Sequence, residues 1–195
     1  MHFSLSGLFL LPSLALALPT TASPRQLLPT GQDVRQDVIN IHHAVLALDA
    51  TVQSFNGGPF LTALVEGAPV LAGVAEIHRV NRAGFRHALA ALPFSVQDSN
   101  NVIDTVVATV NKSIPAATRH LKAKEPAFKE SRLGAVVIAS LTLLLYDHDT
   151  FSAAVLAKSN LGIGEAKIKE GTEAVANIHN AIQDAINSYT VNAMV

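Results

Sequence analysis

The chain has 195 residues, a formal net charge of −1 and no cysteine. The near-zero charge offers no basic surface for nucleic acid or for an anionic membrane, and the lack of cysteine excludes a disulfide scaffold, a thiol nucleophile and a thiolate metal site. Hydrophobic residues make up 49% of the chain and aromatic residues only 5%, which favours closely packed helices over an aromatic sugar-binding platform.

The N-terminal segment has the features of a secretion signal. Residues Phe3 to Leu18 form an uncharged apolar run that is too short to span a bilayer and that contains the small-residue pattern Ala15-Leu16-Ala17. We therefore expect a signal peptide over residues 1–17, with cleavage after Ala17 or as late as Ala22.

The rest of the chain is expected to form a linker, residues 23–30, and a single helical domain, residues 31–190. This length suffices for one domain with a sizeable core. Residues Thr190 to Val195 are too short for a lipid-anchor signal, so we expect a secreted, extracellular protein without a transmembrane segment.

The first predicted helix begins at Thr30-Gly31-Gln32-Asp33, which has the spacing of a capping box. The apolar residues that follow step by four and three, as in a helix that buries one narrow face. They are Val34, Val38, Ile41, Val45, Leu48, Val52 and Phe55. The helix is expected to end at Asn56-Gly57-Gly58-Pro59.

The second helix is predicted from about Phe60 to Leu92, with Pro69 expected to kink or interrupt it. Its expected inward face contains Leu61, Leu64, Leu71, Val74, Ile77, Asn81 and Phe85. The third helix opens at a second capping box, Ser95-Val96-Gln97-Asp98, and runs to Leu121. Pro115 lies inside it, so we expect this helix to be bent or divided there.

Two more helices complete the prediction. Ser131 is the expected cap of the fourth helix, whose inward face includes Leu133, Val136, Val137, Ser140, Leu141, Leu144, Phe151 and Val155. The fifth follows the turn at Asn160 to Gly164. No alternating strand pattern is present, so the sequence predicts an all-α antiparallel bundle of about five helices.

The search for catalytic and metal sites returns nothing that favours an enzyme. None of the eight histidines has the four-residue partner of a helical zinc site. Asp147-His148-Asp149 is the best cation cluster, but consecutive residues fan around a helix, which favours a solvated surface. Asp33 and Asp37 share a helix face. We interpret them as residues that favour the helix start and solubility, and not as a catalytic pair of carboxylates. We therefore expect no catalytic residues, no metal and no cofactor.

Two surface features are also predicted. His78 and His87 lie among arginines at positions 79, 82 and 86 and are interpreted as a solvated basic stripe. Asn111-Lys112-Ser113 is the only N-glycosylation sequon, so Asn111 is the expected glycan site, presented by a bend at Pro115.

The layout resembles the fungal hydrophobic surface-binding protein A family, which includes the cell-wall galactomannoproteins. The resemblance runs from about Asp33 to Tyr189. The matching segments are Val38 to Ile41 with Phe55-Asn56-Gly57-Gly58, the junction Leu92-Pro93-Phe94-Ser95, Lys122 to Phe128, Ile138 to Leu141, and the fifth helix through Ile178, Ile182, Ile186 and Tyr189. The resemblance implies a secreted, non-catalytic helical domain that adsorbs to hydrophobic surfaces and recruits hydrolases to them, or that binds fatty acids between its helices.

Two departures from the family bear on this expectation. The chain shows neither a Ser/Thr-rich stalk nor a lipid-anchor tail, which puts covalent attachment to the cell wall in doubt. The basic stripe is also not a family feature. The alternative is a cell-wall galactomannoprotein or structural antigen, or a host-directed effector, without a small-molecule ligand.

Two mechanisms are open for the apolar residues. In the first, a fatty acid or other lipid fills a cavity. Ser140 is then the preferred partner of the lipid head group, with Thr109 and Asn81 as lesser options. The alternative interpretation of Ser140 is that its hydroxyl donates to a carbonyl of its own helix. The expected lining residues, whose alternative is ordinary core packing, are Val106, Val110, Val137, Leu141, Leu144, Ile178 and Ile182.

In the second mechanism, the bundle opens on a hydrophobic surface and its amphipathic faces spread there. The seam from Val34 to Phe55 is then the part expected to adsorb.

Overall fold

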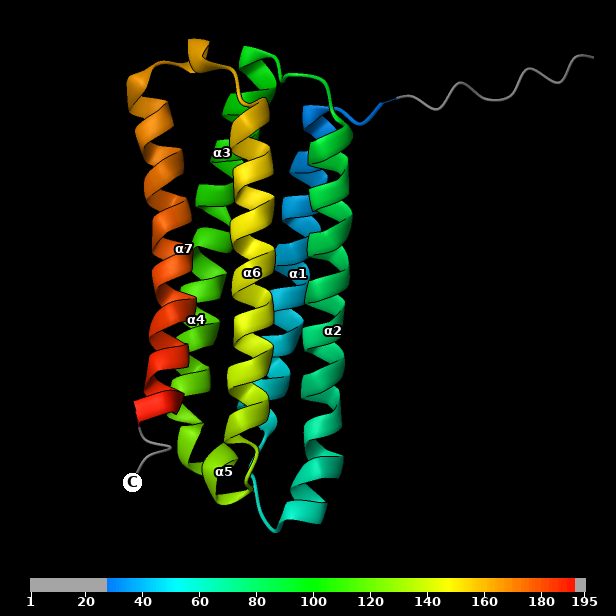
Figure 1. Cartoon of the computed structure of the whole chain (residues 1–195), viewed down its shortest axis with the longest axis vertical. Helices are drawn as coiled ribbons and strands as arrows, with labels where there is room; N and C mark the ends of the chain where they lie inside the picture. Colours follow the sequence, from blue (N-terminus) through cyan, green and yellow to red (C-terminus); the bar gives the residue numbers. More distant parts are fainter. Residues whose placement is uncertain (1–27, 192–195) are drawn as a thin grey trace, which may run out of the picture.

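The computed structural model describes residues 28–191, so the predicted signal peptide and most of the linker lie outside the described residues. The described chain forms seven α-helices and one short 3₁₀ helix and contains no strand (Figure 1). The elements are α1 (Gly31–Ser54), α2 (Phe60–Ala90), α3 (Val96–Ala108), α4 (Val110–Ala123), α5 (Glu125–Glu130), α6 (Gly134–Lys158), η1 (Leu161–Ile163) and α7 (Glu165–Val191).

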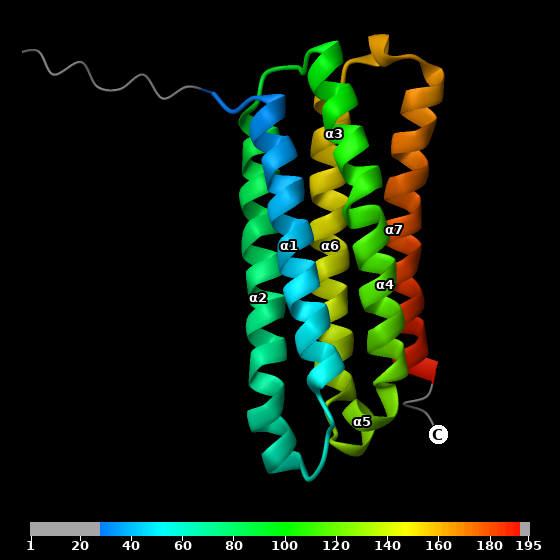
Figure 2. The ribbon, with the colours of Figure 1, turned by 180° about the vertical axis from the view of Figure 1, so that it is seen from behind.

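These elements build five long rods, because α3 and α4 follow one another along one line of the bundle and α5 is a short connection at its lower end (Figures 1 and 2). The rods form a ring in which α1 packs on α2 and on α3–α4, α7 packs on α3–α4 and on α6, and α6 packs on α2. Successive rods run in opposite directions. The predicted all-α bundle of about five helices is confirmed.

Helix α1 forms as its sequence predicts. The Thr30 side chain accepts a hydrogen bond from the Asp33 amide, and the Asp33 carboxylate accepts one from the Thr30 amide. The seam from Val34 to Phe55 is buried, with Leu48 partly buried against it. The Phe55 ring stacks on Phe128 of α5, with ring centroids 4.3 Å apart, and thereby closes the lower end of the bundle.

The turn between α1 and α2 depends on a glycine. Gly57 has φ of +76°, and a Cβ there would lie 2.9 Å from the carbonyl oxygen of Ala127. Ser131 holds the same turn, because its Oγ accepts from the Gly58 amide and donates to the Gly58 carbonyl, each at 3.1 Å. The prediction that Ser131 caps the fourth helix is therefore wrong, and the residue before α6 is Leu133.

Helix α2 differs from its prediction in the face that packs. The helix continues through Pro69, so the proline does not interrupt it, and the expected kink stays a prediction. The N-terminal half of the expected inward face is wrong, since Leu61, Leu64 and Leu71 are exposed. The buried residues there are Ala63, Gly67 and Val70. This half of α2 is apolar nearly all round, so its periodicity did not reveal which face packs, and the small residues are the ones that admit neighbouring helices.

Helix α2 is also long and apolar enough to cross a membrane by length and composition, with a mean hydropathy of 1.6 over its most apolar window. In the structure it packs lengthwise against α1 and α6 (Figure 1).

The third rod is divided at Thr109 and not at Pro115. Thr109 has φ of −118° and ψ of −89°, and its hydroxyl donates to the Thr105 carbonyl, whereas Pro115 lies within α4. A proline has no amide to donate to the carbonyl four residues before it. That carbonyl belongs to Asn111, and it accepts from the Asn177 side chain of α7 at 3.4 Å.

Histidine–aspartate pairs cross four of the interfaces between neighbouring rods, and we call these interfaces the seams between rods. They are His87 and Asp37 (α2 to α1, 2.8 Å), His78 and Asp147 (α2 to α6, 2.6 Å), His120 and Asp49 (α4 to α1, 2.9 Å), and His179 and Asp149 (α7 to α6, 2.9 Å). The seams therefore carry polar links while the apolar side chains face inward.

These pairs correct several surface predictions. Asp147 and His148 are buried, so the solvated-surface interpretation is wrong for both, and Asp37 is buried beside its helix-start neighbour Asp33. The basic stripe is only partly solvated. Arg79 and Arg86 are exposed, but Arg82 lies 3.8 Å from Asp147 and donates to Thr150.

We predict that Asp147→Asn lowers the free energy of unfolding by about 2 kcal/mol, because it removes the buried charge that accepts from His78 and faces Arg82. Urea denaturation measures this change. The control is Asp184→Asn, which breaks the exposed ion pair with Lys122 and should cost less than about 1 kcal/mol. Equal losses in the two variants would contradict the role given to Asp147.

Candidate functional site: a central cavity

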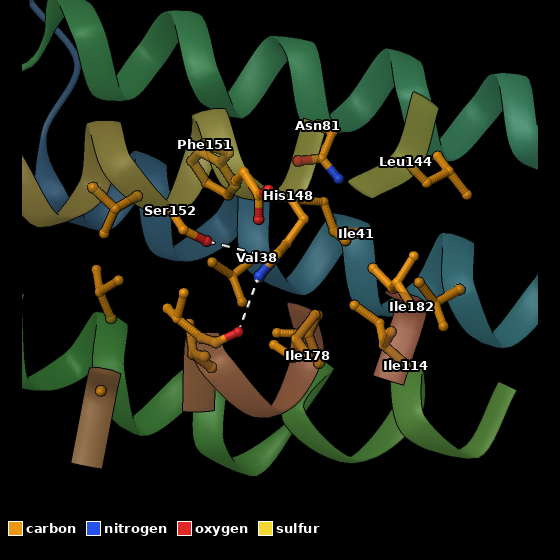
Figure 3. A pocket seen from close by; sticks show the side chains of 18 of the residues that line it. Val38, Ile41, Asn81, Ile114, Leu144, His148, Phe151, Ser152, Ile178 and Ile182 are labelled. Carbon is orange, nitrogen blue, oxygen red and sulfur yellow. Dashed lines mark hydrogen bonds between the residues drawn. The ribbon is translucent and has the colours of Figure 1, made fainter. Parts of the chain in front are cut away.

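The middle of the ring is hollow. A cavity of about 440 Å³ runs between the rods and is lined by side chains from α1, α2, α3, α4, α6, η1 and α7. Its walls are mostly Val, Ile and Leu, and Figure 3 shows Val38, Ile41, Ile114 and Ile178 around it. These aliphatic side chains meet across the ring without filling it.

Seven of the residues expected to line a cavity do line this one. They are Asn81, Val106, Val110, Leu141, Leu144, Ile178 and Ile182. They come from five different helices, and only the closed ring brings them together. Whether they bind a ligand stays a prediction.

Three expected residues lie elsewhere. Ser140 and Val137 line a second, smaller pocket of about 80 Å³ between α2 and α6. Thr109 lines neither pocket, and its hydroxyl bonds back to its own helix. Of the three head-group candidates, Asn81 alone faces the large cavity.

The two pockets are neighbours with a shared wall. The residues that line both are Leu48, Val52, Leu121, Leu141 and Leu144. The outer side of the small pocket is formed by Leu64, Leu71 and Val136, which are exposed.

Asn81 is the unusual polar group of the large cavity. Its side chain projects into the cavity from α2, and the residue is only 6% exposed (Figure 3). Its Oδ1 is buried and has no hydrogen-bond donor within the described part of the chain. Leaving a buried amide oxygen unpaired costs about 1–3 kcal/mol, so this atom is a natural contact for a bound ligand.

His148 faces the same cavity from α6. Its Nε2 lies 3.2 Å from the carbonyl oxygen of Val175, and its Nδ1 lies 3.5 Å from the Ser152 hydroxyl. A carbonyl only accepts, so Nε2 carries the proton and Nδ1 is the acceptor. Burial lowers the pKa of His148 below its ordinary value, which favours the neutral ring.

Sequence reasoning missed His148 and Ser152. The signal was present, because the inward face of the fourth predicted helix steps from Leu144 to Phe151 through position 148. The aspartates on either side of His148 favoured the interpretation of this segment as a solvated surface cluster.

The cavity reaches the surface near η1. Leu156 and Leu161 belong to its lining and are more than half exposed. The exposed end of the lining therefore lies at Leu156 of α6 and Leu161 of η1.

Two further predictions can be placed on the structure. Asn111 lies on the α4–α7 seam, where its Oδ1 accepts from Asn177 at 2.7 Å, and its glycosylation stays a prediction. No group of three or more metal-ligating side chains close enough to hold an ion occurs between residues 28 and 191.

We predict that the protein loses stability as the pH falls below the ordinary histidine pKa of 6.5, because the unfolded chain then binds a proton at His148 more readily than the folded protein does. His148→Gln should reduce this loss, measured as the difference in urea unfolding between about pH 7.5 and about pH 5.5. His43→Gln, at an exposed position, is the control. An unchanged pH dependence in His148→Gln would rule out this contribution.

Comparison with solved structures finds proteins with a similar helical fold. The fold is similar to that of AFMP4P, solved in complex with palmitic acid, with a TM-score of 0.73 and 18% sequence identity over 82% of this chain and 99% of that one. It is also similar to ligand binding domain 1 of the Penicillium marneffei MP1 protein, complexed with arachidonic acids, with a TM-score of 0.71 and 21% identity over 82% and 98%.

Ligand binding domain 2 of the same MP1 protein, complexed with multiple arachidonic acids, gives a TM-score of 0.67 with 17% identity over 79% of this chain and 92% of that one. At these identities the structures show a common fold. No curated protein matches the chain. The family model described as hydrophobic surface binding protein A matches residues 31–157, well over half of the sequence. The chain therefore belongs to the hydrophobic surface binding protein A family.

Proposed function

We propose that the protein binds a fatty acid or a related single-chain lipid in the central cavity and does not transform it. The observation that carries this proposal is the apolar hollow of about 440 Å³ with one buried amide that lacks a partner. Ligand sites of this kind are largely apolar, with few polar groups to orient the ligand. The palmitic and arachidonic acid complexes of similar folds support the same ligand class.

Asn81 is the proposed head-group partner, and His148 and Ser152 line the same cavity. Asn81 takes the role first considered for Ser140, because Ser140 lines the smaller pocket. The aliphatic chain would then lie along the Val, Ile and Leu walls. Each buried methylene contributes about 0.8 kcal/mol, so the chain supplies most of the affinity and the head group sets its orientation.

The polar groups at the cavity support a binding protein over an enzyme. Ser152 and His148 are four residues apart on α6, but the hydroxyl lies 3.5 Å from Nδ1 and the opposite ring nitrogen faces a backbone carbonyl and not a carboxylate. Asp147 and Asp149, the carboxylates on either side of His148 in sequence, pair with His78 and His179. This arrangement does not activate a serine nucleophile.

We predict that Val106→Phe weakens fatty-acid binding at least about tenfold, because a larger side chain occupies part of the cavity. Displacement of a fluorescent fatty acid from the delipidated protein measures the affinity, and native mass spectrometry of the purified protein tests for a co-purifying lipid. The control is Leu89→Phe on the exposed side of α2. A protein that carries no lipid and does not bind the probe would refute the proposal and favour a wall protein or effector without a ligand.

Adsorption to hydrophobic surfaces is a second candidate function, and a specific observation favours it. Apolar side chains are exposed together on the N-terminal half of α2, with Val136 of α6 beside them. We call this the α2 patch; its residues are Phe60, Leu61, Leu64, Val65, Leu71 and Val136. Glu66 is the only charged residue between positions 60 and 75. The patch is accessible in the closed bundle, whereas the α1 seam first expected to adsorb is buried.

We predict that the double variant Leu61→Glu/Val65→Glu is depleted less than the native protein by hydrophobic beads at moderate salt, because it places two charges in the α2 patch. The matched control is Leu89→Glu/Leu92→Glu, with Leu89 near the C-terminal end of α2 and Leu92 just beyond it, both exposed. Equal depletion of both variants, or equal native depletion onto a charged surface, would contradict a role for the patch. Secretion, association with the cell wall and recruitment of a hydrolase stay predictions.

A further inference from the structure

The electrostatics of the cavity constrain the head group of its ligand. None of the described residues that line it is a lysine or an arginine. The carboxylates at its wall are Asp49 of α1 and Asp149 of α6, and they pair with His120 of α4 and His179 of α7. A carboxylate that entered this cavity would therefore find no fixed cation to balance it.

The nearest cation in sequence to Asn81 is held away from the cavity. The Arg82 guanidinium lies over the Phe85 ring at 4.1 Å, donates to Thr150 and faces Asp147. Arg82 does not belong to the cavity lining. The charges beside Asn81 are thus already engaged in the α2–α6 seam.

His148 does not supply the missing charge either. It is 9% exposed, and burial lowers its pKa, so the neutral ring is favoured at neutral pH. The one proton of the neutral ring lies on Nε2 and is directed to the Val175 carbonyl. Its remaining nitrogen, Nδ1, accepts hydrogen bonds, and a carboxylate has no hydrogen to give it.

The hydroxyls of the lining are already used. Thr118, Ser159 and Thr172 each donate to a carbonyl of their own helix. The Ser152 hydroxyl lies 3.5 Å from Nδ1 of His148, the acceptor nitrogen of that ring. Asn160 caps η1 through its side-chain oxygen. The buried lining atom without a partner is Oδ1 of Asn81, an acceptor, and a ligand satisfies it only by donating a hydrogen.

We infer that the cavity selects aliphatic ligands whose head group is uncharged and bears a hydroxyl, such as a fatty alcohol or a fatty acid in its protonated form, with Asn81 as the recognising residue. This inference rests on the proposed lipid-binding function. A hydroxyl donates to the Asn81 oxygen and accepts from the amide nitrogen of the same side chain, whereas a carboxylate accepts from that nitrogen but leaves the buried oxygen without a donor. Burying an unpaired carboxylate also costs several kcal/mol, which the chain's apolar contacts would have to offset.

A fatty acid would therefore enter with its proton and bind more weakly as the pH rises above the pKa of its carboxyl group. The titratable groups that face the site are His148, Asp49 and Asp149, and the histidine partners of the two aspartates lie on α4 and α7. A fatty alcohol carries no such proton, so the ratio of the two affinities isolates the head group from the protein's own titration.

The test compares 1-decanol, decanoate and methyl decanoate as competitors of N-phenyl-1-naphthylamine, an uncharged fluorescent probe, on the delipidated protein. At about pH 8 we expect decanol to bind more than about tenfold tighter than decanoate, with the gap narrowing at about pH 5. Methyl decanoate is uncharged but has no hydroxyl, and we expect it to bind about fivefold more weakly than decanol.

Two variants test whether Asn81 is the residue that produces the preference for decanol over methyl decanoate. Asn81→Leu should abolish the preference for decanol over methyl decanoate while leaving the protein folded, because it removes an unpaired buried amide. Thr118→Val is the matched control, since it removes a lining hydroxyl that already has a partner, and it should preserve the preference.

The outcomes are distinct. The inference is overturned, while the lipid-binding function stands, if decanoate binds as tightly as decanol at about pH 8. The same holds if Asn81→Leu still prefers decanol over methyl decanoate. If no competitor displaces the probe at either pH, the proposed function fails, and the inference fails with it.

Discussion

The structure depends on one packing constraint: five helical rods arranged in a ring leave a space at the centre that aliphatic side chains do not fill. Interiors of folded proteins are normally packed as densely as organic crystals. Here Ile41, Ile178 and Ile182 are almost fully buried and still line a cavity of about 440 Å³. The hollow follows from the number of rods and from the size of their inward side chains.

A hollow bundle needs its seams held together by something other than central packing. The His78–Asp147 and His87–Asp37 pairs link α2 to its two neighbours, and the buried Tyr189 donates from α7 to the Leu121 carbonyl of α4 at 2.8 Å. Polar groups placed between rods and apolar groups directed inward explain how a ligand space coexists with a closed ring. Among the polar side chains of the lining, Asn81 has the buried oxygen without a partner, and it is the group that we propose recognises a ligand.

The sequence predicted the fold well where signals are local or strictly periodic. The capping box at Thr30, the side-chain cap at Ser95 and the α1 seam appear as expected, because they involve residues only three or four positions apart. At Ser95 the Asp98 carboxylate accepts from the Ser95 hydroxyl, so this cap is not a reciprocal capping box. Prediction failed in the first half of α2, where an almost uniformly apolar helix has no periodic contrast. It also failed at Asp147, since burial of a carboxylate depends on a histidine from another helix.

By itself, the sequence determined the helices, most of their ends and the aliphatic character of the interior, since these depend on backbone capping and on the spacing of side chains along one helix. Only the tertiary structure decided that a cavity exists, that Asn81 faces it while Ser140 lies in a neighbouring pocket, and that His148 is buried beside it. The volume left at the centre depends on how side chains from five rods meet, and no single segment of the chain contains that information.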